Sequence, residues 1–125
     1  MLTYYTTVAS WLAWLTGRGF PDASIYYLRN VLHNYPDAKC VELLQRTLEA
    51  MGPSSVILID EIVLADDATH WQAAQLDITM MASVAAMERS HGQWLSLLHG
   101  AGLKLESVWK YTEETAESLM VVKIN

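Results

Sequence analysis

Apolar side chains form two short continuous runs near the start of the chain, with a helical rhythm between them. Residues 25–32 and 55–64 are dense in Ile, Leu, Val and Tyr, as in strands that are covered on both faces. Residues 36–51 instead repeat Val41, Leu44 and Leu48 at helical spacing, and Gly52-Pro53 ends that pattern. Two strands joined by one helix predict a βαβ unit with parallel strands.

The second half predicts two more helices and two more strands. Residues 69–86 and 91–100 each begin with the spacing of a capping box, which favours a helix start. Residues 104–111 and 117–124 alternate weakly between apolar and polar positions, and a short charged segment joins them, so we expect an antiparallel hairpin. The predicted fold class is therefore α/β: a parallel βαβ unit followed by a C-terminal antiparallel hairpin.

The first twenty residues differ from the rest of the chain. Residues 1–16 are almost free of charge, and an apolar face predicts a helix at 4–15, followed by a Gly17-Arg18-Gly19 linker. The run is too short to span a bilayer, and no basic residue precedes it as in a signal peptide, so packing is favoured over a leader or an anchor. We therefore divide the chain into residues 1–20 and a main unit at 21–125.

Composition narrows the classes of partner. The chain has 125 residues, 52% hydrophobic and 18% charged, which indicates one globular domain. Its net charge is −6 and its basic residues are scattered, so we expect no nucleic-acid partner. The single cysteine, Cys40, forms no internal disulfide, which fits a reducing, cytoplasmic compartment, and its helical position favours a small apolar role.

His33 is the first candidate for chemistry. It ends the first apolar run and precedes the Pro36 turn, which places it at the carboxyl end of a strand, where open α/β sheets bind ligands. An ordinary pKa near 6.5 suits a general base. The alternative is a histidine that packs beside the turn and bonds a backbone carbonyl; the spacing leaves both open.

Asp60 and Glu61 interrupt the second apolar run. A buried carboxylate is costly unless it is paired or hydrogen-bonded, so two of them near a strand end indicate a site. The alternative is that the strand stops at Ile59. The other histidines, His70, His91 and His99, occupy polar helical positions without metal-ligand spacing, so we expect them to be solvated and predict no metal.

Several segments, in order, resemble the C-terminal part of the S-adenosylmethionine-dependent O-methyltransferases that methylate small phenolic and polyketide metabolites. The resemblance runs from about Ile25 to the end of the chain. The residues that carry it are Tyr27 to Cys40, Leu58 to Leu64, Asp77 to Met81, Glu88 to Ser90, Trp94 to Leu98 and Ala101 to Leu103. It implies the C-terminal half of a Rossmann-like methyltransferase sheet.

The resemblance also implies roles for particular residues. His33 corresponds to the general base of the family's His-Asp-Trp-x-Asp motif, and Glu61 and Glu88 to the two glutamates that flank and orient it. Arg29 falls where the family has a basic residue beside the cofactor. The segments implied to contact substrate contain Asn34, Met80 and Met81.

The sequence departs from the family in two ways. Asn34 stands where the family has aspartate, and Tyr35 where it has tryptophan. The glycine-rich loop and the acidic residue that hold S-adenosylmethionine in the family should precede Ile25, where only residues 1–24 stand. We therefore expect a truncated homologue that keeps the general-base face and does not methylate alone.

Two other functions stay open at this point. One is a cofactor-independent acid/base catalyst, such as a cyclase, dehydratase or isomerase, acting on a small aromatic or polyketide-like molecule. The other is a methyltransferase completed by a partner chain. The open edge of the strand at 25–32 invites pairing, so homo- or hetero-oligomers through that edge are expected.

Overall fold

The computed structural model describes the main unit of the chain with short gaps. The predicted helix at 4–15, residues 1–20 as a whole, His70, Met80 and Met81 lie outside the described residues. Within the helix predicted at 69–86, the residues that are described have helical backbones. The described residues are 22–67, 71, 75, 78–79, 82 and 88–125.

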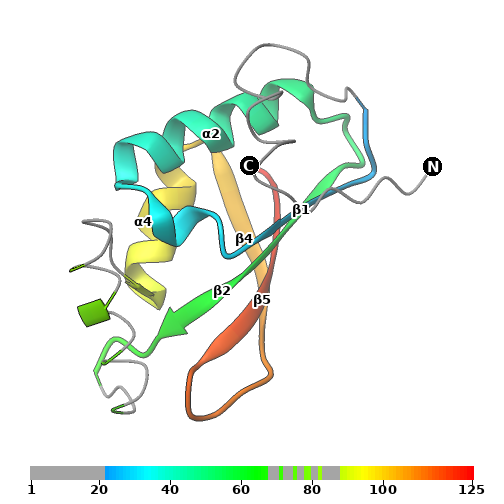
Figure 1. The fold of residues 1–125 in the computed structure, drawn as a ribbon. Helices are drawn as coiled ribbons and strands as arrows, with labels where there is room; N and C mark the ends of the chain where they lie inside the picture. The colour runs from blue at the N-terminus through cyan, green and yellow to red at the C-terminus, as the bar shows by residue number, and fades with distance from the viewer. Residues whose placement is uncertain (1–21, 68–70, 72–74, 76–77, 80–81, 83–87) are drawn as a thin grey trace.

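The sheet confirms the predicted fold class. Strand β1 (Ile25–Arg29) pairs in parallel with β2 (Val56–Leu64), and α2 (Asp37–Ala50) connects them (Figure 1). Strands β4 (Leu103–Lys110) and β5 (Glu117–Ile124) form the antiparallel hairpin. The order across the sheet is β1-β2-β5-β4, so the last strand of the sequence lies inside the sheet.

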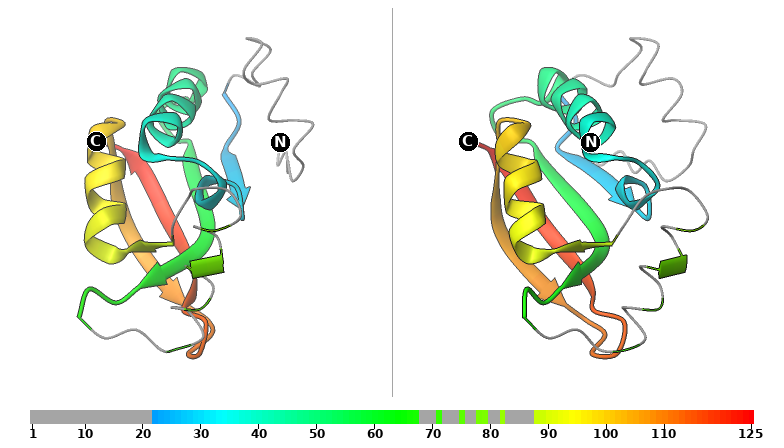
Figure 2. Two further views of the ribbon diagram at one scale, coloured as in Figure 1. Left: turned by 60° about the vertical axis from the view of Figure 1, so that its left-hand side comes forward. Right: turned by 90° about the vertical axis from the view of Figure 1, so that its left-hand side faces the viewer.

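Two helices form a layer on one face of this sheet. Both views in Figure 2 show α2 and α4 (His91–Gly100) together on the same side of the strands. The core between the layers contains fully buried apolar side chains from both helices and from β2, β4 and β5, among them Leu44, Ile57, Ile59, Trp94, Leu98, Leu103, Met120 and Val122. Within the described part of the chain, no helix is both long and apolar enough to cross a bilayer.

The end of β1 differs from the sequence prediction. We predicted a strand at 25–32 that ends beside His33, but β1 ends at Arg29 and His33 lies in a short 3-10 helix, η1 (Leu32–Asn34). Asn30 has a φ of 51°, a left-handed conformation that asparagine tolerates better than most residues. This residue turns the chain out of the sheet before the apolar run is finished.

The boundaries of α2, β2 and β4 agree with the prediction to within one residue, and those of α4 and β5 agree at both ends, while the ends of the helix predicted at 69–86 lie outside the described residues. The Ser90 side chain accepts from the backbone N–H of Gln93, and the Gln93 side chain accepts from the N–H of Ser90, which confirms the capping box. The two-residue strand β3 (Arg89–Ser90), which pairs in parallel with the end of β2, was not predicted. Two residues are too few to show a period.

Candidate functional site

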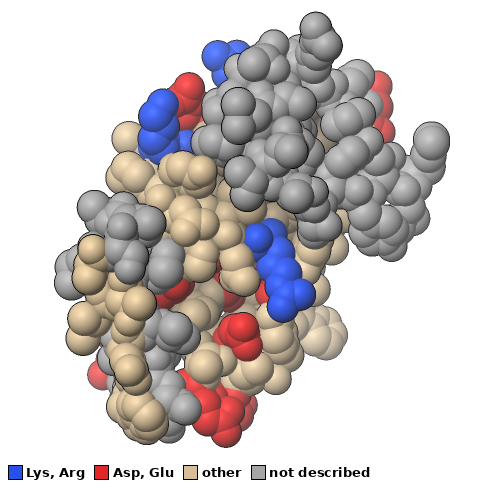
Figure 3. Space-filling model, in the orientation of Figure 1, with Lys and Arg blue, Asp and Glu red and all other residues tan. Residues whose placement is uncertain are grey.

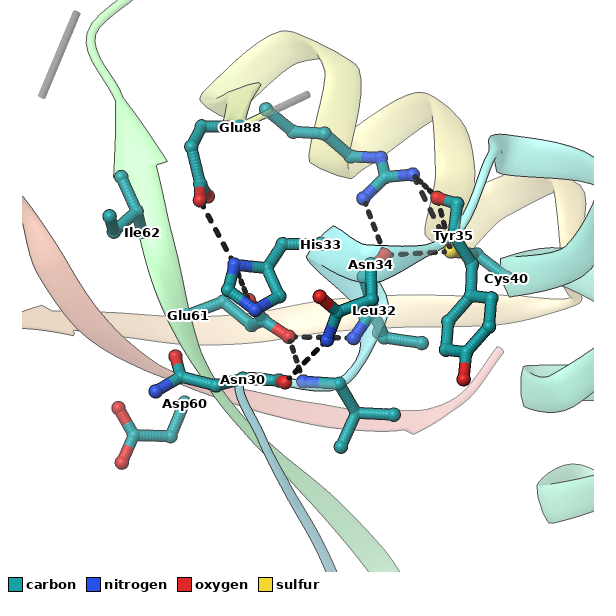
Figure 4. A network of polar contacts seen from close by, with 12 residues as sticks. Asn30, Leu32, His33, Asn34, Tyr35, Cys40, Asp60, Glu61, Ile62 and Glu88 are labelled. Atoms are coloured by element: carbon teal, nitrogen blue, oxygen red, sulfur yellow. Dashed lines mark hydrogen bonds and ion pairs between the residues drawn. The ribbon is translucent and has the colours of Figure 1, made fainter. Parts of the chain in front are cut away.

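Three titratable side chains from distant parts of the sequence meet at the carboxyl ends of β1 and β2. His33 lies in η1, Glu61 in β2, and Glu88 directly before β3. The ring nitrogen Nδ1 of His33 lies 3.0 Å from Glu88 Oε1, a hydrogen-bond distance, and 3.8 Å from Glu61 Oε2. Figure 4 shows the imidazole between the two carboxyl groups.

Glu61 holds the turn that carries His33. Its Oε1 accepts hydrogen bonds from the backbone N–H groups of Val31 and Leu32, each 2.8 Å long. Its Oε2 has no hydrogen-bond partner among the described residues and faces His33. One oxygen of this buried carboxyl group is therefore structural, and the other is available for proton chemistry.

The environment raises the pKa of both His33 and Glu61. Burial raises the pKa of Glu61 to about 7, against the opposing effects of His33 and of the two backbone N–H groups. The hydrogen bond to Glu88 raises the pKa of His33, while partial burial lowers it and the Asn30 carbonyl adds to the rise. The cluster can therefore exchange protons near neutral pH, where a general base needs to act.

Asp60 takes no part in this cluster, although the sequence grouped it with Glu61. Its side chain points away from His33 (Figure 4). The hydroxyls of Tyr27 and Tyr111 each donate to it over 2.6 Å, and the Arg29 Nε lies 3.6 Å from it. Arg29, implied to stand beside the cofactor, is thus an exposed side chain next to Asp60.

The other residues that the sequence analysis singled out, Asn34, His91, His99 and Cys40, lie outside the cluster of His33, Glu61 and Glu88. The Asn34 side chain donates to the Asn30 carbonyl within the turn, so it shapes the turn beside His33. His91 and His99 are exposed, as predicted. Cys40 is fully buried in α2, burial raises the pKa of its thiol to about 11, and the thiol donates to the Leu32 carbonyl at 3.2 Å.

Sequence reasoning missed Arg89. Its guanidinium is buried, pairs with Asp37 at 2.7 Å, and donates to the backbone carbonyls of Leu32 and Tyr35. The only signal was its place next to Glu88. No periodic pattern indicates that a charged residue at that position is buried.

The three residues of the cluster could also hold a metal ion, since one donor atom from each lies within 4.8 Å of the others. Glu61 would offer only Oε2, because Oε1 already accepts two backbone N–H groups. The absence of a metal stays a prediction.

The described residues do not supply the glycine-rich part of a cofactor site. The described glycines are Gly52, after α2, Gly92 and Gly100, within α4, and Gly102, just after it. Only Gly92 follows a parallel strand, the two-residue β3, and it is a single glycine, whereas the loop that approaches a nucleotide in such folds contains several.

The face drawn in Figure 3 carries both basic and acidic side chains. On the face drawn in Figure 3, the described lysine and arginine side chains are separated from one another. The same face is hollowed near its centre, and acidic side chains are visible around that hollow. The visible charge does not form the continuous basic patch that a phosphate backbone attracts.

Comparison with protein-family models shows that residues 11–104 match the O-methyltransferase domain. A demethylsterigmatocystin 6-O-methyltransferase of Emericella nidulans is 44% identical over 100 residues, which cover 80% of this chain and 49% of that protein. A 16-O-methyltransferase of Alternaria brassicicola is 42% identical over 110 residues, 88% of this chain and 28% of that protein. The chain thus spans half or less of the length of these relatives.

Solved structures give the same picture. LepI in complex with SAM and a structure described as a pericyclic reaction enzyme each superpose with a TM-score of 0.80 at 32% identity, over 84% of this chain and 27% of theirs. OxaC in complex with sinefungin and meleagrin superposes with a TM-score of 0.76 at 32% identity, over 84% of this chain and 27% of its own.

Proposed function

Because this chain belongs to the family that carries the O-methyltransferase domain, we propose that it supplies the proton-accepting face of an S-adenosylmethionine-dependent methylation. The substrate is a small hydroxylated secondary metabolite, since the relatives are named for O-methylation and one solved neighbour holds meleagrin.

A single observation carries this proposal: His33 Nδ1 lies between Glu88 Oε1, at 3.0 Å, and Glu61 Oε2, at 3.8 Å. The His33 side chain is 17% exposed, so a substrate hydroxyl can reach the ring. The hydrogen bond to Glu88 orients the ring, and both carboxyl groups stabilise the imidazolium that forms when the hydroxyl loses its proton.

The glycine-rich part of the cofactor site is assigned to chain outside the described residues, either elsewhere in the same protein or in a partner. Such a partner would reach this unit through the edge of β1, which has a neighbouring strand on only one side among the described residues. The His33 chemistry needs nothing from the cofactor except that it be held beside the deprotonated hydroxyl.

The first test is methyl transfer to demethylsterigmatocystin, the compound for which the Emericella relative is named. The 125-residue chain is assayed with S-adenosylmethionine, alone and mixed with the separately expressed upstream part of that relative. We expect product in the mixture, and a rate about 10²- to 10⁴-fold lower with His33→Ala, because that variant removes the general base.

Asp60→Asn is the matched control, since Asp60 neighbours Glu61 in β2 but points away from His33. This variant should retain the rate of the unmodified chain. A His33→Ala variant that keeps the full rate would contradict the role of His33. Product from the chain alone would show that no partner is needed.

A second candidate function is cofactor-free acid/base catalysis of a rearrangement or cyclisation. One observation favours it: a solved neighbour with a TM-score of 0.80 is described as a pericyclic reaction enzyme. In this case the Glu61 carboxyl, with its pKa raised to about 7, and His33 would pass a proton between two positions of one substrate.

Mass spectrometry of the same reaction without S-adenosylmethionine separates the two functions. Methylation adds one methylene unit to the substrate and requires the methyl donor, whereas a rearrangement leaves the substrate mass unchanged and proceeds without it. A new compound of unchanged mass that disappears with His33→Ala would support the second function. Conversion that depends strictly on the methyl donor would exclude it.

A further inference from the structure

Arg89 is the one described cation that is almost fully buried, with 2% of its surface exposed. Its guanidinium lies 5.3 Å from the centre of the Trp94 ring, in a cation–π contact. Burial of an arginine is unfavourable unless its N–H groups are hydrogen-bonded. The acceptors of the Arg89 guanidinium therefore indicate its structural role.

Two of those partners are backbone carbonyls on either side of His33. The Arg89 NH1 group donates to the Leu32 carbonyl at 3.2 Å, and the NH2 group donates to the Tyr35 carbonyl at 3.0 Å. One planar guanidinium thus spans the short helix that carries the base. Arginine suits this task, because its donors have a fixed fork geometry.

Glu61 holds the same turn from its other end. It accepts from the Leu32 N–H, while Arg89 binds the Leu32 carbonyl, so both polar groups of the residue before His33 are fixed by buried side chains. The covalent neighbour of Arg89 is Glu88, the carboxyl group that hydrogen-bonds His33. A single short segment therefore fixes the backbone of the base and also provides its partner.

The bland interpretation is that Arg89 only neutralises Asp37. The Asp37 side chain is 66% exposed, and ion pairs with an exposed partner contribute little because water screens them. The two carbonyl bonds are more sheltered and would leave unpaired acceptors if they were lost. The contacts with the turn are therefore the ones that require a buried arginine.

We propose that Arg89 is a positioning residue that clamps the turn carrying His33 and thereby keeps its imidazole within hydrogen-bond distance of Glu88. This proposal rests on the proposed function only where it treats His33 as a general base. The clamp itself can be measured without substrate or cofactor.

The test is Arg89→Lys in the full 125-residue chain. Lysine keeps the positive charge but cannot bind two carbonyls with one planar group, so electrostatic effects on His33 largely cancel and the loss of the clamp remains. Amide hydrogen exchange at Leu32 and Tyr35 should become at least about tenfold faster. The pKa of His33, read from its ring signals by NMR, should fall towards its ordinary value as the contact with Glu88 loosens.

Asp37→Asn is the matched control, since it removes the ion pair and leaves both carbonyl bonds. It should change the same exchange rates by less than about fivefold. Equal effects of the two variants would overturn the proposal, as would an Arg89→Lys variant with unchanged exchange and an unchanged His33 pKa.

The unmodified chain provides a test that does not depend on how the variants fold. The Leu32 and Tyr35 amides should exchange as slowly as the amides of the buried strand β2, although they lie in a short connecting turn. Exchange as fast as in an exposed loop would overturn the clamp. If the clamp is found but His33→Ala leaves product formation intact, the clamp stands and the proposed function fails.

Discussion

Asp60 and Glu61 are consecutive residues of the same strand, yet their surroundings on the two faces of the sheet differ. Asp60 accepts from two tyrosine hydroxyls and lies beside Arg29. Glu61 uses one oxygen to hold two backbone N–H groups and turns the other, without a hydrogen-bond partner among the described residues, towards His33.

The difference shows how one strand gives two consecutive carboxylates different hydrogen-bond partners on its two faces. Both are buried, so burial alone does not distinguish them. Each oxygen of Asp60 accepts from one tyrosine hydroxyl, so this carboxylate joins Tyr27 of β1 to Tyr111 after β4. Glu61 lacks such donors on Oε2, and burial raises its pKa to about 7.

The largest effect on stability is expected from Glu61→Leu. This variant leaves the N–H groups of Val31 and Leu32 without their acceptor, which should lower the free energy of unfolding by about 2–4 kcal/mol in urea denaturation. Glu61→Gln keeps a carbonyl acceptor and should cost about half as much. Equal losses in the two variants would mean that the charge, and not the hydrogen bonds, holds the turn.

A change of pH is expected to alter the free energy of unfolding by a smaller amount. Burial raises the pKa of Glu61 from 4.5 to about 7, so the folded chain binds a proton that the unfolded chain releases between these values. The raised pKa of His33 acts in the same direction. The stabilisation of the folded chain by these bound protons is fully present at low pH. It is lost as the pH rises through the folded-state pKa values.

The free energy of unfolding should therefore fall as the pH rises from about 4.5 to about 7, and Glu61→Gln should remove about 1–3 kcal/mol of that fall. The exposed carboxyls of Glu42 and Asp66 have lowered pKa values and titrate below this window. A series of urea denaturations across the window measures the slope. The same slope in Glu61→Gln as in the unmodified chain would contradict the role of Glu61.

The smallest loss of stability is expected on the face of the sheet that carries Asp60. Tyr111→Phe removes one donor to Asp60, while Tyr27 remains, and Tyr111 is 53% exposed, so the cost should be about 0.5–1.5 kcal/mol. The pKa of His33 should not change. An altered His33 pKa in this variant would show that the two faces of the sheet are coupled. It would contradict the view that Asp60 and Glu61 act independently.

The sequence predicted the elements because their periodicity is local. The capping box at Ser90 and Gln93 sets the start of α4, and the apolar runs locate β1 and β2 to within a few residues. The carboxylates that interrupt the second run, and the histidine that ends the first, could likewise be recognised as candidates, because polar residues at the ends of buried strands are unusual.

What the sequence determined by itself was the class of each element and a short set of candidate residues. Only the tertiary structure decided that β5 lies between β2 and β4, that Asp60 and Glu61 serve opposite faces, and that Glu88 reaches His33 across 55 residues of sequence. Strand order and polar pairing depend on contacts between distant segments of the chain. A local hydrophobic pattern contains no information about such contacts. The left-handed Asn30 and the burial of Arg89 were missed for the same reason: each is stabilised by partners that fold back from elsewhere in the chain.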